Sequence, residues 1–116
     1  MNNALEALPE SIGNLLELRE LRLSQNRLMV VPESLGELAH LKAIDLRNNH
    51  LMALPDALRN LRSLTFLDVR ANRLVSLREG FGEFPNLEKL DVRWNKICAD
   101  PGWIQQLEER GCDVYV

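Results

Sequence analysis

The sequence predicts an α/β fold: a short horseshoe, or right-handed β-solenoid, with a parallel concave sheet on one side and convex loops and short helical turns on the other. Two observations predict this fold class. The chain aligns with itself without gaps in lines of 23 residues, and a fixed period of this length is typical of stacked repeats. Each line also contains a tract in which aliphatic and polar residues alternate, which is the period-two pattern of a half-buried strand.

The repeats organise the chain as one domain of 116 residues, a length that allows one modest core. A partial repeat comes first, three full repeats follow, and the last repeat runs into a C-terminal cap. The boundaries are 1–17, 18–40, 41–63, 64–86 and 87–116. One coil cannot bury its apolar side alone, so the core must come from stacking.

The alternating tracts should form neighbouring strands whose aliphatic residues point into the core. The aliphatic pairs are Leu21/Leu23, Ile44/Leu46, Leu67/Val69 and Leu90/Val92. One asparagine recurs per repeat, at Asn3, Asn26, Asn49, Asn72 and Asn95, followed by an interior column of Leu5, Leu28, Leu51, Leu74 and Ile97. A buried amide needs partners for both its oxygen and its NH2 group. We interpret the asparagines as a ladder in which each side chain bonds the backbone of its own and the next loop.

The second half of each repeat predicts the convex side. Pro9, Pro32 and Pro55 stand where a proline can open a short helical turn. Two apolar columns follow, at Ile12, Leu35, Leu58, Phe81 and Ile104, and at Leu15, Leu38, Leu61, Phe84 and Leu107. In the third full repeat Arg78 replaces the proline, which predicts local repacking around the larger phenylalanine rings.

The C-terminal segment predicts a capping helix and a last strand. Asp100 and Pro101 form a helix-start signal, and "PGWIQQLEERG" predicts a helix of about ten residues that Gly111 ends. The following "CDVYV" predicts a strand in which Cys112, Val114 and Val116 face one way. Trp103 should cover the last coil.

These repeats resemble the leucine-rich repeat family in its 23-residue form, LxxLxLxxNxLxxLPxxLxxLxx, over essentially the whole chain. The C-terminal cap, with its tryptophan and its "GC" before the last strand, is similar to those of bacterial intracellular members. The resemblance implies an exposed concave sheet on which protein partners usually bind. It does not name a partner, because one solenoid architecture serves many functions.

The residues between the core positions of each strand should form columns on this concave face. The columns are Glu20, Ala43, Phe66, Lys89; then Arg22, Asp45, Asp68, Asp91; then Ser24, Arg47, Arg70, Arg93; and, at the margin, Gln25, Asn48, Ala71, Trp94. Each of the three aspartates has an arginine two residues on, which favours an ion-pair ladder over a metal or acid–base cluster.

Two interpretations of the concave face remain open. The charged stripes either keep the sheet soluble and in register, or they select a partner for which Phe66 and Trp94 supply affinity. Trp94 equally fits a role in the cap, packed over the last coil near Cys98. Under the binding interpretation the contact residues are Phe66, Trp94, Arg47, Arg70, Arg93, Asp45, Asp68, Asp91, Lys89 and Arg22.

No pattern predicts catalysis, a cofactor or a metal. The formal net charge of −3 argues against a nucleic-acid partner, and no apolar run approaches the roughly 20 residues of a membrane span. His40 and His50 occupy different repeat positions and are expected at the surface. Cys98 and Cys112 are too few for a metal set; whether they pair stays open, and a reduced cytoplasmic chain is favoured. We therefore expect a non-enzymatic module that binds a protein partner.

The N-terminal end predicts an unprotected sheet edge. Asn3 already belongs to the asparagine column, so the strand that should precede it is missing and strand 18–24 is left bare. Either Met1 begins a fragment of a longer array, or another chain covers the edge. The alternative function is therefore a structural or assembly unit that associates through this end.

Overall fold

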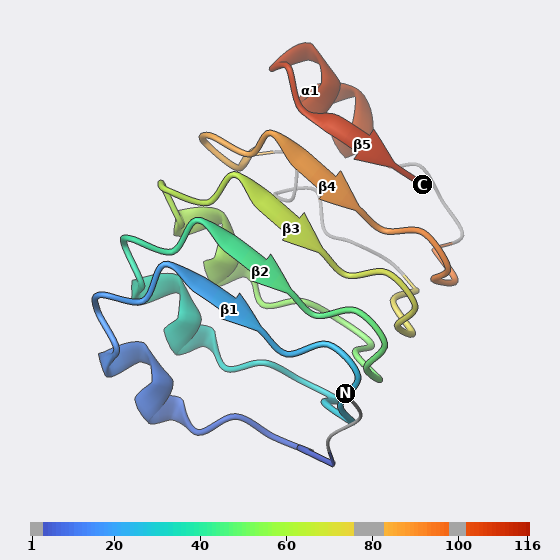
Figure 1. Ribbon diagram of the computed structural model, residues 1–116. Helices are drawn as coiled ribbons and strands as arrows, with labels where there is room; N and C mark the ends of the chain where they lie inside the picture. Colours follow the sequence, from blue (N-terminus) through green and yellow to red (C-terminus); the bar gives the residue numbers. More distant parts are fainter. Residues whose placement is uncertain (1–3, 76–82, 98–101) are drawn as a thin grey trace.

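The alternating tracts form short strands that lie side by side in one parallel sheet (Figure 1). The computed structural model describes residues 4–75, 83–97 and 102–116. Within these residues the strands are β1 (Glu20–Arg22), β2 (Ala43–Asp45), β3 (Phe66–Asp68), β4 (Lys89–Asp91) and β5 (Asp113–Tyr115). Their order in the sheet follows the chain, so among the described residues each strand pairs only with the strands next to it in sequence.

The strands pair in the register that the 23-residue alignment predicts. Leu21 pairs with Ile44, Ile44 with Leu67, and Leu67 with Leu90, while Leu90 continues onto Val114 of β5. Equivalent positions of successive repeats therefore lie one above the other. A column of letters in the aligned sequence is a column of side chains on the molecule.

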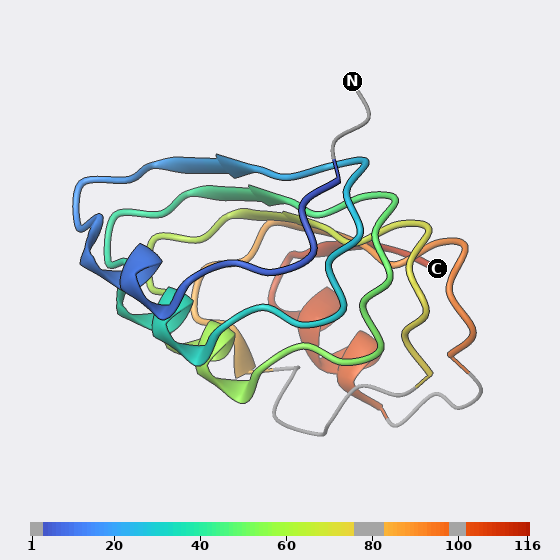
Figure 2. The same cartoon turned by 90° about the horizontal axis from the view of Figure 1, so that it is seen from below.

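The convex side consists of short 3-10 turns that pack behind the sheet (Figure 2). They are η1 (Glu10–Asn14), η2 (Glu33–Glu37) and η3 (Asp56–Asn60), and each follows one of the predicted prolines. The proline carbonyl accepts the first hydrogen bond of each turn, for example from Leu35 N to Pro32 O at 3.2 Å. The predicted role of the prolines is confirmed, whereas Arg78 and Phe81 lie outside the described residues.

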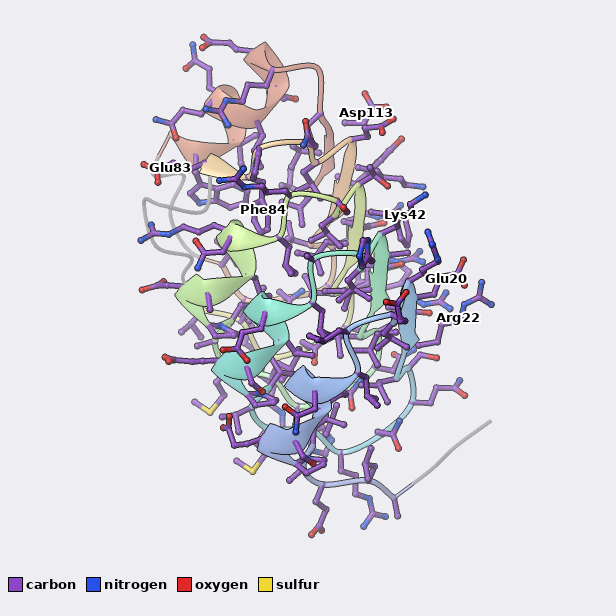
Figure 3. The ribbon with its side chains drawn as sticks, turned by 90° about the vertical axis from the view of Figure 1, so that its left-hand side faces the viewer. Glu20, Arg22, Lys42, Glu83, Phe84 and Asp113 are labelled. Atoms are coloured by element: carbon purple, nitrogen blue, oxygen red, sulfur yellow. The ribbon has the colours of Figure 1, made fainter. Side chains whose placement is uncertain are left out.

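Stacking of the coils creates a continuous core of aliphatic side chains between the sheet and the turns. Phe84 is buried between these layers (Figure 3). The first coil departs from the prediction, because it is stacked on one side only within the described residues. Leu15 is 55% exposed, whereas Leu38 at the same repeat position is fully buried. Leu5, predicted in an interior column, is also exposed.

The asparagine ladder is confirmed for the described rungs. Asn72 accepts a hydrogen bond from Leu51 N at 3.0 Å and donates from Nδ2 to Val69 O of its own coil and to Leu46 O. Asn49 and Asn95 repeat this pattern. The neighbouring coil that each amide bonds is the preceding one, which corrects the predicted direction. Asn3 lies outside the described residues.

The C-terminal cap is shorter than predicted. Its helix, α1 (Trp103–Glu109), has seven residues, and Gly102 precedes it with a left-handed φ of 85°. The predicted start at residues 100–101 lies outside the described residues. Gly111 ends the helix as predicted: with φ 90° it donates to Glu108 O, and Cys112 N donates to Leu107 O.

The side chains of the cap cover the last coil largely as predicted. Trp103 and Leu107 are buried, and Cys112 is buried beside them. The prediction that Val116 faces inward with Cys112 is wrong, because Val116 at the end of the chain is exposed. β5 is nevertheless a full neighbour of β4, so the concave sheet continues onto the cap.

Candidate functional site

The concave face begins with the outward side chains of the strands. Glu20 and Arg22 project from β1 away from the convex turns (Figure 3). They pair with one another at 2.9 Å, and both are exposed. Arg22 aligns with Asp45 of β2, so it stands at the head of the predicted aspartate column.

Each aspartate of this column is bound by the arginine two residues later. Asp68 accepts from the backbone N of Arg70 at 3.1 Å and from its Nη2 at 2.7 Å. Asp91 and Arg93 repeat the same pattern at the same distances, and Asp45 and Arg47 form a slightly longer pair. Each aspartate carboxylate thus accepts hydrogen bonds from both the backbone and the side chain of the same arginine, which fixes the direction of the guanidinium.

The pairs also join across the coils. Arg47 Nε lies 3.7 Å from Asp68 Oδ2, and Arg70 Nε lies 3.3 Å from Asp91 Oδ2. Every arginine except the last therefore bridges its own aspartate and that of the next coil. The predicted ion-pair ladder is present in the structure, and it runs along the sheet across three strands.

Burial of the ladder differs from the expectation of an open face. Asp68 and Asp91 are each only 2% exposed, because the arginine side chains lie over them. Burial raises the pKa of Asp91, but hydrogen bonds from the Arg93 side chain and backbone outweigh it, so its pKa lies below the ordinary value of 3.8. Asp91 is therefore a carboxylate at neutral pH and does not act as an acid.

The ladder ends in aromatic rings at the C-terminal end of the sheet. Tyr115 of β5 aligns with Asp91 and so occupies the aspartate column. Arg93 lies 5.4 Å from the Tyr115 ring centre and 5.7 Å from that of Trp94. Lys89 Nζ lies 5.2 Å from Tyr115 and 5.5 Å from Phe66. We call Phe66, Lys89, Arg93, Trp94 and Tyr115 the aromatic cluster.

Trp94 is the most exposed aromatic ring of the cluster. It is 70% exposed, which overturns the interpretation that it packs over the last coil as part of the cap. Its backbone is left-handed, with a φ of 60°, and Gln25, Asn48 and Ala71 at the same repeat position are left-handed too, with φ values of 61°, 56° and 56°. This turn directs the ring to the margin of the concave face.

A hollow of about 310 Å³ lies over β1 to β3 and shares Phe66 with the aromatic cluster. The small side chain of Ala43 lines it together with the larger side chains of Arg22, Arg47 and Phe66. All ten predicted contact residues lie on this face or its margin. Tyr115 and Asp113 were missed, although continuing the columns of the aligned repeats into "CDVYV" places both on the same face.

Comparison with known proteins agrees with this geometry. A family model described as a leucine-rich repeat region matches residues 3–109. The chain belongs to the leucine-rich repeat family. A solved leucine-rich repeat protein of Leptospira interrogans superposes on 99% of the chain with a TM-score of 0.87 and 28% identity. The chain spans 29% of the length of that protein, and no curated protein matches it.

Leucine-rich repeat domains generally bind protein partners and are typically non-enzymatic. Within the described part of this one, no group of three or more His, Cys, Asp or Glu residues is placed to hold a metal ion. Burial, together with Asp113 and Glu108, raises the pKa of the Cys112 thiol to about 11, so it is not a reactive thiolate. Over the same residues, no helix is long and apolar enough to cross a membrane.

Proposed function

We propose that this leucine-rich repeat domain binds a protein partner through its concave face and that it has no catalytic activity of its own. The observation that carries the proposal is the aromatic cluster, in which Trp94 and Tyr115 remain exposed while Lys89 and Arg93 lie against their rings. Tryptophan, tyrosine and arginine are the residue types that most often dominate binding energy at interfaces.

The Asp/Arg ladder suits this role because its charges are already paired. A partner that covers Asp68 and Asp91 does not have to desolvate free carboxylates, since arginines cover them before binding. The arginine side chains are also held in place, which lowers the conformational entropy that binding would cost. The ladder would then set selectivity and the rate of encounter, while the aromatic cluster supplies affinity.

The proposal covers residues 1–116 as one domain that acts as a scaffold in the cytoplasm. Cys112 is a free, buried thiol, which fits a reducing compartment. Neither a cofactor nor a nucleic acid is part of the proposed activity. The ten predicted contact residues, from Arg22 to Trp94, are proposed as the contact set, and we now add Tyr115.

The decisive experiment compares single substitutions on the two faces in a binding assay with a partner isolated on the wild-type domain. Phe66→Ala, Trp94→Ala and Tyr115→Ala should each weaken binding by about 2 kcal/mol or more, roughly 30-fold, if the ring is a hot spot. Arg70→Glu should instead change the salt dependence and the choice of partner, since it breaks the centre of the ladder.

Arg59→Glu provides the matched control on the convex side, where Arg59 pairs with Glu83 at 3.6 Å. It should leave binding unchanged. The concave proposal is wrong if the three ring substitutions leave capture of the partner intact while Arg59→Glu abolishes it. Urea melts of every variant separate a lost contact from a lost fold.

A second candidate function is assembly through the β1 edge. β1 pairs with β2 on one side and, among the described residues, with no strand on the other. Leu15 and Leu16 beneath this edge are both more than half exposed. An unpaired edge with apolar surface below it favours association. Sedimentation across a concentration series tests this candidate, and a strict monomer at high concentration excludes it.

A further inference from the structure

A second surface lies where the chain leaves the sheet after each asparagine. The coils are hydrogen-bonded to one another here as well: His50 N donates to Leu28 O at 2.9 Å, and Arg73 N donates to Leu51 O at 2.8 Å. Arg27 and Lys96 make the equivalent bonds at 2.9 Å. Equivalent side chains are therefore aligned along this side as strictly as they are on the sheet.

Two columns of side chains point outward from this surface. Leu28, Leu51 and Leu74 are fully buried, so the residues one before and one after each of them face solvent. The residues before them form a basic column of Arg27, His50, Arg73 and Lys96. The residues after them form an apolar column of Met29, Met52 and Val75, with Val30 beside it. We call the two columns together the lateral face.

The apolar column is exposed to an extent that the fold does not require. Its residues and Val30 are between 48% and 66% exposed. Glu6 occupies the same repeat position in the first coil and is also exposed, so a charged residue is compatible with the backbone there. Large apolar side chains repeated over three successive coils mark a contact surface more often than single ones do.

The charge of the lateral face is opposite to that of the chain. The segments 25–31, 48–54, 71–75 and 94–97 contain no Asp or Glu, although the whole chain has 17 acidic and 14 basic residues. Arg27, Arg73 and Lys96 are exposed, and His50 is partly exposed. A partner for this face must therefore be acidic and must offer apolar side chains beside its acidic ones.

We propose that the lateral face docks an acidic amphipathic helix of a protein partner, aligned with the solenoid axis. Successive coils are about 4.8 Å apart, and one turn of an α-helix advances about 5.4 Å, so side chains one turn apart meet neighbouring coils. A row of acidic residues would then contact the basic column while the adjacent apolar row contacts Met29, Met52 and Val75. Flexible methionine side chains adapt to such an apolar row.

A lipid surface fits the lateral face less well. Stable attraction to anionic lipids usually requires a cluster of about 4–8 Lys or Arg residues, and the lateral face has three and a histidine. The net charge of −3 opposes the approach of the rest of the chain to such a membrane. The two closely spaced columns suit the narrow stripe of a single helix instead.

The test uses two labelled synthetic helical peptides and fluorescence anisotropy with the full chain. One peptide has a row of leucines beside a row of glutamates, and the other has lysines in place of the glutamates. The acidic peptide should bind, more weakly as salt rises, and the basic peptide should not. Arg73→Glu and Met52→Ser should each weaken binding of the acidic peptide at least tenfold.

Two controls make the result specific. Arg59→Glu makes the same charge change on the convex side, and Phe66→Ala alters the concave face; both should bind the acidic peptide like the wild type. Equal losses for Arg73→Glu and Arg59→Glu would reduce the effect to net charge and overturn the proposal. Because Phe66→Ala reports on the concave face alone, a failure here is distinguishable from a failure of the concave proposal.

Two further outcomes would assign the lateral face to another occupant and so overturn the proposal. One is binding to phosphatidylglycerol-containing vesicles that Arg73→Glu abolishes, in the absence of peptide binding. The other is concentration-dependent sedimentation that Arg73→Glu abolishes, which would make a second copy of the chain the occupant. Circular dichroism and urea melts of each variant confirm that it is folded.

Discussion

Single residues on the concave face are under constraints that their letters alone do not reveal. Asp68 and Asp91 lie among polar letters in the sequence, yet they are buried because arginines from two coils cover them. The spacing of Asp and Arg was enough to predict the pairs. It could not predict the burial, which depends on the path of a long side chain across a neighbouring strand.

Asp91→Asn should destabilise the protein at neutral pH and matter less in acid. The folded-state pKa of Asp91 lies below its value in the unfolded chain, so its stabilisation is present above the unfolded pKa and is lost as the pH falls through the folded pKa. We expect a loss of about 1–3 kcal/mol at pH 7 from the weakened hydrogen bonds, shrinking below about pH 4. Urea melts of the wild type and of Asp91→Asn at pH 7 and below about pH 4 measure this loss of stability. The same loss at both pH values would contradict the lowered pKa of Asp91.

Trp94→Asn should stabilise the fold while weakening partner binding. A non-glycine residue at a left-handed φ costs roughly 1–2 kcal/mol, and asparagine costs less than other residues. Asn48 already occupies the equivalent position of an earlier repeat, with a left-handed φ of 56°. We expect the variant to gain about 0.5–1 kcal/mol, seen as a higher Tm. A lower Tm would contradict this expectation and would mean that the exposed ring contributes to stability.

At the scale of elements, agreement with the sequence depends on whether the period or a local signal predicted the element. The strands and 3-10 turns match because stacking repeats the same environment in each coil. The cap departs from the period: α1 is shorter than its "PGWIQQLEERG" segment, and Tyr115 was missed because β5 follows a helix instead of a proline turn. Continuing the columns of the aligned repeats into the segment after the helix would have placed Tyr115 on the concave face.

Gly36→Ala should separate two convex turns. A Cβ at Gly36 would lie 2.6 Å from the carbonyl oxygen of Ala57 in η3, a contact with backbone that cannot rotate away. Overpacking of this kind costs about 1–3 kcal/mol. Glu37→Ala, on the same turn and exposed, is the matched control and should change stability little. Urea midpoints measure both, and equal midpoints would show that η2 and η3 can shift apart freely.

At the scale of the whole molecule, stability should decrease from the centre of the stack to its first coil. Repeat proteins gain stability from the interfaces between neighbouring units, and the first described coil has one interface where the central coils have two. The exposure of Leu15 and Leu16 is the visible result. Sequence predicted the bare edge, but the number of side chains left uncovered below it came only from the packing.

Amide hydrogen exchange tests this gradient with matched positions. Leu18 N donates to Leu15 O at 2.9 Å, and Leu41 N donates to Leu38 O at 3.0 Å in the equivalent bond of the next coil. The local geometry is the same, so the difference in exchange rate reports the stacking alone. We expect the Leu18 amide to exchange faster than that of Leu41. Equal protection at low concentration would show that the first coil is as stable as the second.

Arg47 and Arg70 each contact two aspartates, and this has a consequence for how such a chain can grow. The repeat 41–63 contains polar groups that connect it to both neighbouring coils. Asn49 donates a hydrogen bond to the coil before it, and Arg47 forms an ion pair with the coil after it. Duplication of the DNA that encodes these 23 residues would add one strand to the sheet. The new coil would bring both the asparagine and the arginine that its contacts with the neighbouring coils require. A residue inserted within the strand tract would turn the rest of that strand inside out, whereas a longer connection is tolerated, as the step of 24 residues from Leu90 to Val114 shows. The domain would therefore grow by whole repeats, and each added repeat would lengthen its binding surfaces by one coil.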